Sequence, residues 1–141
     1  MACPLCDTDG GTLVHRGPAW RVIRADDAQH PAFYRVVWQR HVAEFSALSP
    51  TDRAACMEVV ATVEQTLRAQ LQPTKINLAA LGNMVPHLHW HVIARFADDT
   101  HFPDPVWAPA RRPAHVARLE ALRQQLPALD NALRLALAAH R

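Results

Sequence analysis

Apolar positions recur along the chain with the period of a strand in some segments and with the period of a helix in others. Segments 20–24 (WRVIR) and 34–40 (YRVVWQR) are rich in β-branched and aromatic residues, which predicts a strand in each. Segment 75–81 (KINLAAL) is a further predicted strand, followed by the turn signal Gly82-Asn83. Segment 87–95 (HLHWHVIAR) alternates between polar and apolar residues along its first half, which also predicts a strand.

Two other segments have helical spacing. Ser49 can cap a helix with Pro50 at its first position, and this helix must end near Pro73. Its apolar stripe consists of Cys56, Val60, Val63, Leu67 and Leu71. A second leucine stripe lies between 114 and 140, where Pro127 is expected to break or kink the helix.

The predicted order is strand, strand, helix, strand, strand, helix, which fits an α+β domain with a mostly antiparallel sheet. A chain of 141 residues is the size of one domain and can build its own core. The prolines in 96–113 predict a loop. We expect the residues after this loop to form an appended helical element.

Composition excludes several classes of protein. With 50% hydrophobic and 20% charged residues the chain is globular, and a net charge of +2 gives no reason to expect a nucleic-acid or membrane partner. The chain contains no run of 18 apolar residues, so we expect no membrane-spanning helix. The N-terminus lacks the features of a secretory signal, so we expect a cytoplasmic location. Three cysteines, an odd number, argue against a disulfide framework.

Three histidines are crowded in segment 87–95. Because residues two apart on a strand share a face, His87, His89 and His91 form a row with neighbours roughly 7 Å apart. The opposite face carries the expected core residues Leu88, Trp90 and Val92. Burial alone does not explain three titratable rings side by side, so the row predicts chemistry with protons, phosphate or metal.

Two kinds of chemistry suit such a row. Three imidazoles can bind Zn²⁺, but the end rings of one strand are too far apart to converge on an ion without a bend. Alternatively, one neutral imidazole attacks a phosphorus atom while a neighbouring histidine donates a proton to the departing oxygen. The chain has no Gly-rich phosphate loop of the ATPase kind.

The segment His87-Leu88-His89-Trp90-His91-Val92-Ile93 matches His-φ-His-φ-His-φ-φ, where φ is hydrophobic. With this motif the chain resembles the histidine triad (HIT) superfamily of nucleotide hydrolases and transferases. Segment 75–107 is similar to small bacterial HIT proteins, and Arg40-His41 resembles the end of their second strand. The resemblance covers about residues 3–107. It implies a HIT-like fold with about five strands and a main helix, a HIT domain over 1–113 and a helical extension over 114–141.

The resemblance also implies catalytic roles. His89 would be the nucleophile that takes the nucleoside phosphate, and His91 would help the leaving group depart. His87 would orient the array or bind metal, and Asn83, where many relatives have Gln, would bind phosphate oxygens. The implied reaction occurs at the α-phosphate of a purine nucleotide conjugate, such as a dinucleoside polyphosphate, a nucleoside phosphoramidate or an acylated adenylate.

Other candidate substrate-binding residues are less closely tied to the motif. Asn77 is a candidate for the same pocket, or a residue of a strand-end turn. Asp26 or Asp27 is a candidate for the ribose-binding acid, or a solvated loop acid. Trp107 either borders the active site or packs in the fold.

Cys3-Pro4-Leu5-Cys6 is a C-x-x-C motif, which is typical of zinc or redox sites but also arises by chance. A redox pair is expected at a helix start within a βαβ unit, which this N-terminus does not show. Two thiolates at this spacing are half of a zinc knuckle. The resemblance implies that His41 and His87 complete a structural zinc site, with His15 and His30 as replacement ligands. Cys56 is expected to be buried in a helix.

Three functions remain open from the sequence. The first is the HIT enzyme with a nucleotidyl-histidine intermediate, the second a nucleotide sensor with little turnover, and the third a zinc hydrolase that uses the histidine row as ligands. The resemblance further implies a homodimer and no organic cofactor.

Overall fold

The computed structural model describes residues 2–140 as an α+β fold, which confirms the predicted class. Five strands form one sheet in the order β1-β2-β3-β5-β4, and every neighbouring pair is antiparallel. The strands are β1 (Thr12–Arg16), β2 (Trp20–Arg24), β3 (Phe33–Trp38), β4 (Lys75–Ala79) and β5 (His89–Arg95). The helices are α1 (Pro4–Asp7), the 3-10 turn η1 (Phe45–Ala47), α2 (Pro50–Leu71) and α3 (Val116–Leu137).

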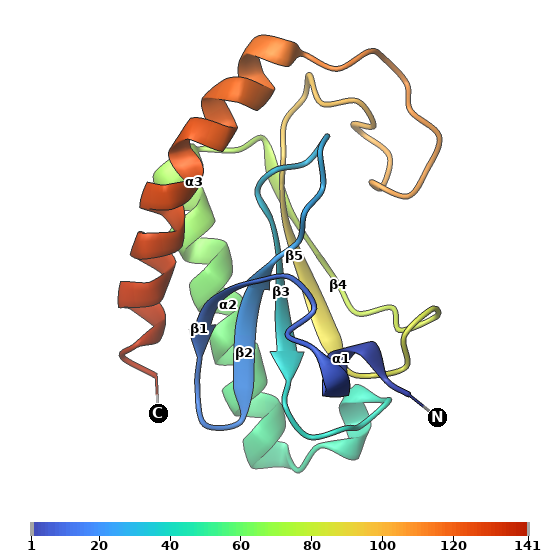
Figure 1. The fold of residues 1–141 in the computed structure, drawn as a ribbon, viewed down its shortest axis with the longest axis vertical. Helices are drawn as coiled ribbons and strands as arrows, with labels where there is room; N and C mark the ends of the chain where they lie inside the picture. The colour runs from blue at the N-terminus through green and yellow to red at the C-terminus, as the bar shows by residue number, and fades with distance from the viewer. Residues whose placement is uncertain (1, 141) are drawn as a thin grey trace.

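One face of the sheet forms the main core together with α2 and α3 (Figure 1). This face carries Leu88 and Val92, both buried, and the partly buried Trp90, as the alternation predicted. The buried leucines of α3 belong to the same core cluster. The opposite face of β3 and β5 is therefore left for the candidate site.

Both long helices begin and end close to the predicted positions. The Ser49 hydroxyl accepts a hydrogen bond from the Asp52 backbone N–H at 3.1 Å, and α2 ends before Pro73. However, Pro127 does not break α3, which continues through it to Leu137. A proline in a helix costs about 3 kcal/mol. Leucines buried on both sides of Pro127 offset this cost.

Two local features differ from the sequence prediction. Strand β1 was not predicted, because only Val14 of its residues is buried and its pairing with β2 is irregular between Leu13 and His15. Strand β5 begins at His89 rather than at position 87. The His87 N–H instead donates to the Val85 carbonyl oxygen at 2.8 Å, so His87 lies in the preceding turn.

Helix α1 docks on the sheet face that carries the histidines. Leu5 packs against Ile23 and Val37, which lie on that face. The buried Arg21 guanidinium donates to the carbonyl oxygens of Leu5, Thr8 and Asp9 at 2.6, 3.0 and 3.1 Å. These hydrogen bonds hold the Cys3–Cys6 segment beside the turn that precedes β5. No helix of residues 2–140 has both the length and the apolarity needed to cross a membrane.

Candidate functional site

The His89 ring is oriented by the backbone of the turn before it. Its Nδ1 lies 2.6 Å from the His87 carbonyl oxygen. Because a carbonyl oxygen only accepts, Nδ1 carries the hydrogen and Nε2 keeps a free lone pair. Burial lowers the pKa of His89 and the Arg35 cation lowers it further, against the opposing effect of the bond to His87. The ring is thus neutral at neutral pH, with Nε2 as its acceptor nitrogen.

His91 lies beside His89 with a different hydrogen-bond pattern. The two ring centroids are 4.9 Å apart and the rings meet edge to face. Arg35 Nε donates to His91 Nδ1 at 3.4 Å, so the proton of the neutral His91 ring resides on Nε2. Burial, with help from His89 and Arg35, lowers the pKa of His91 to about 4. Neighbouring rings therefore offer one acceptor and one donor nitrogen.

His89 and His91 open onto a cavity of about 500 Å³. The turn between β4 and β5 forms one wall, where Gly82 adopts a left-handed backbone with φ of 70°. Asn83, for which the resemblance implies phosphate binding, lies in this wall. The remaining lining residues are Pro4, Leu5, Gly10, Arg35, Leu81, Met84, Val85 and Trp107.

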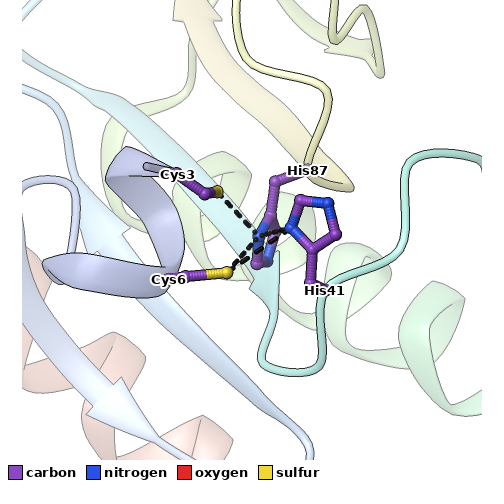
Figure 2. A group of neighbouring side chains, drawn as sticks. All are labelled: Cys3, Cys6, His41 and His87. Carbon is purple, nitrogen blue, oxygen red and sulfur yellow. Dashed lines mark hydrogen bonds between the residues drawn. The ribbon is translucent and has the colours of Figure 1, made fainter. Parts of the chain in front are cut away.

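The His87 ring belongs to a different group of side chains, which it forms with Cys3, Cys6 and His41 (Figure 2). Its Nδ1 lies 3.4 Å from Cys3 Sγ, 3.5 Å from Cys6 Sγ and 3.2 Å from His41 Nδ1. His41 Nδ1 is also 3.4 Å from Cys6 Sγ. The His87 Nε2–H donates to the Trp38 carbonyl oxygen at 2.6 Å, so its Nδ1 lone pair points toward the cysteines.

These four side chains fit a tetrahedral zinc site. Ligand atoms around zinc, with bonds of about 2.3 Å to sulfur and 2.0–2.1 Å to nitrogen, are separated by roughly 3.3–3.8 Å. Three sulfur–nitrogen separations of 3.4–3.5 Å and the nitrogen–nitrogen separation of 3.2 Å are close to these values. Among residues 2–140, this is the only group of three or more metal-binding side chains close enough to share an ion. The geometry therefore favours the cysteine cluster over the histidine row as a metal site.

The family model described as HIT domain matches residues 11–98, which is more than half of the chain. The chain belongs to the HIT domain family. Membership implies nucleotide-binding or hydrolase-type activity. A search of curated proteins gave no match.

Solved HIT structures share the fold. A histidine triad protein from Bradyrhizobium japonicum is 30% identical, with 91% of each chain covered and a TM-score of 0.74. A histidine triad protein from Sinorhizobium meliloti is 29% identical over 86% of this chain and 88% of its own, with a TM-score of 0.70. A Zn-bound histidine triad family protein from Mycobacterium smegmatis is 20% identical over 98% and 94%, with a TM-score of 0.62, which shows the fold alone.

Several candidate residues of this HIT domain lie away from the cavity. Asn77 Oδ1 accepts from the buried Arg95 at 2.8 Å and lines a separate groove. Asp26 lines a different pocket beside Arg123. Asp27 closes a turn by accepting the N–H groups of residues 29 and 30 at 3.0 and 2.9 Å. The structure does not bring these three side chains to the row.

The structure also shows where the replacement ligands, Cys56 and Arg35 of the HIT domain lie. Of the replacement ligands, His30 pairs with His101 at 3.1 Å and His15 packs on Trp20, so neither joins the cysteines. Cys56 is buried in α2, and burial raises its pKa to about 11. Arg35 was missed, although a charge at an alternate position of a strongly apolar strand signals a polar site on that face.

Proposed function

We propose that this HIT domain is a nucleotide hydrolase or transferase acting at the α-phosphate of a purine nucleotide conjugate. The free Nε2 of His89 attacks phosphorus, so a nitrogen–phosphorus bond forms while the bond to the leaving group breaks and its electron pair departs with that group. Water, or another acceptor, then attacks phosphorus and loses its proton to the solvent. The nitrogen–phosphorus bond breaks, and the nucleoside phosphate is released as His89 regains its lone pair.

The observation that carries this proposal is the pair of neighbouring rings, His89 and His91, that line the cavity. The hydrogen bond from His89 to the His87 carbonyl sets the attack direction before a substrate arrives. The His91 Nε2–H can donate a hydrogen bond, rather than a proton, to the atom that leaves phosphorus. Asn83 and the backbone around Gly82, which line the cavity, would bind the non-bridging oxygens.

We also propose that Cys3, Cys6, His41 and His87 hold a structural zinc ion. A bound zinc ion would tie α1 to the turn that precedes β5. His87 then serves two purposes, since its ring belongs to the metal group while its carbonyl oxygen orients His89. No organic cofactor is needed for the transfer described above.

The test of the proposed function is His89→Ala, with His15→Ala as the matched control outside the cavity. The wild type and the control should release nucleoside monophosphate from adenylate conjugates and form an acid-labile nucleotidyl adduct on His89, detected by mass spectrometry. The His89→Ala protein should lose the adduct and at least about 10³-fold in kcat. Unchanged turnover in His89→Ala would contradict the mechanism, and tight nucleotide binding without product in the wild type would indicate a sensor.

A homodimer, as the resemblance implies, belongs to the same proposal. Leu78 on the edge strand β4 and the nearby Leu81 are 44% and 48% exposed, which leaves apolar surface at that edge for a second copy. Light scattering should give twice the chain mass of 15.7 kDa. A monomer mass would contradict the dimer without affecting the proposed reaction.

A further inference from the structure

Arg35 is a charged side chain in the candidate active site to which the proposed function assigns no contact with the substrate. It lies on β3 directly opposite His91, whereas the residue opposite His89 is the apolar Val37. Its guanidinium stacks over the Phe33 ring, 5.2 Å from the centroid, and lines the cavity. The positive charge is therefore at the His91 end of the site.

The hydrogen bonding of Arg35 differs from that of the two fully buried arginines. Arg21 donates to backbone carbonyls and to Gln39, and Arg95 donates to Asp99 and Asn77. Among residues 2–140, Arg35 donates only through Nε, and no carboxylate lies within 4.0 Å of its guanidinium. Asp27 raises the pKa of Arg35 against the effect of burial but forms no ion pair with it, so the terminal nitrogens of this half-buried cation remain available to an anion in the cavity.

We propose that Arg35 binds the leaving group, so that this site prefers substrates whose leaving group is an anion. A phosphate chain or a carboxylate is such a leaving group, whereas the amine of a phosphoramidate is not. This inference rests on the proposed function, because it takes His89 as the nucleophile and His91 as the neighbour of the departing atom.

The chemistry of departure supports this preference. When a phosphoanhydride bond breaks, the electron pair stays on the bridging oxygen, and the released phosphate chain carries the new negative charge. Arg35 can neutralise that charge without a proton transfer. An amine, in contrast, must gain a proton on nitrogen as it leaves, and the site places a fixed cation beside it. A neutral His91 is a weak source of that proton.

The experiment compares Arg35→Leu with Arg35→Lys on three adenylates. These are diadenosine tetraphosphate, acetyl adenylate and adenosine 5′-phosphoramidate. Arg35→Leu should lower kcat/KM about 10- to 100-fold more on the substrates whose leaving group is anionic than on the phosphoramidate, whose smaller loss measures the Arg35–His91 contact that all three substrates share. Arg35→Lys keeps the charge and should recover part of the loss. A comparison of the losses in kcat/KM on the first two substrates shows whether the departure of a phosphate chain or of a carboxylate depends more strongly on Arg35.

Two outcomes overturn the inference. An equal loss on all three substrates would mean that Arg35 holds the scissile phosphate, and no loss on any would mean that it does not touch the substrate. The melting temperature of Arg35→Leu should be unchanged or slightly raised, because the substitution removes a half-buried charge that has no ion pair.

A binding measurement keeps this inference separate from the proposed function. Calorimetric titration of the wild type with AMP and ADP should show tighter binding of ADP, and Arg35→Leu should abolish that difference. If the wild type cleaves none of the adenylates, the proposed function fails while this titration still decides the role of Arg35. An equal preference for ADP in both proteins would contradict the inference.

Discussion

At the residue scale, the three histidines of one motif do not share the same surroundings. His87 presents its ring to the cysteines and its carbonyl oxygen to His89, while His89 and His91 face the cavity. Alternation along a strand was enough to predict that His89 and His91 share a face. The tautomer of His89 was not predictable from the sequence, because it depends on a carbonyl whose direction is set by the turn at 85–87.

The low pKa of His91 predicts a pH-dependent stability. Its pKa is about 4 in the folded chain, below the ordinary value of 6.5, so the unfolded chain binds the proton more tightly. The contribution is fully present above pH 6.5 and is lost as pH falls toward 4. The free energy of unfolding should fall by up to about 3 kcal/mol over this range. Urea denaturation at pH 7, 5.5 and 4 measures it, and an identical pH dependence in His91→Gln would contradict the assignment.

At the scale of elements, α1 shows how a short segment becomes ordered by what surrounds it. A helix of four residues has no stability of its own and leaves no periodic pattern in a sequence. Leu5 and Arg21 fix its position, and the cysteines at both ends of the motif meet two histidines from distant parts of the chain. The C-x-x-C spacing indicated the metal group, but α1 itself was not predicted, because its order comes from tertiary contacts.

Removal of one thiolate should therefore weaken zinc binding and destabilise α1. Cys6→Ser is expected to lower zinc content from about one ion per chain to a small fraction, because the tetrahedral set loses a ligand. Hydrogen exchange should accelerate at residues 4–8, where backbone bonds close the α1 turn. Cys56→Ala is the matched control, since this thiol lies in the core away from the group. Full zinc content in Cys6→Ser would place the metal elsewhere.

At the scale of the whole molecule, the main core and the candidate site lie on opposite faces of the sheet. Its helix-covered face holds the main core, and its other face holds the histidines, Arg35 and α1. The leucine spacing predicted α3 but not where it packs, because a stripe shows only that one side of a helix is buried. Tyr34 and Arg24 of the sheet contact Asp130 of α3 at 2.6 and 3.2 Å. Residues 1–113 as a domain and 114–141 as an extension remain a prediction.

A pair of leucines on α3 tests whether that helix is part of the domain core. Leu133 is fully buried against the sheet cluster, whereas Leu135 on the same helix is 69% exposed. Leu133→Ala should lower the free energy of unfolding by about 2–5 kcal/mol, and Leu135→Ala by less than about 0.5 kcal/mol. Guanidinium unfolding is followed by tryptophan fluorescence, which reports mainly on the sheet because three of the four tryptophans lie in β2, β3 and β5. Equally small effects from the two substitutions would show that α3 is an extension that the sheet does not need, and a large loss confined to Leu133→Ala would make it part of one cooperative unit.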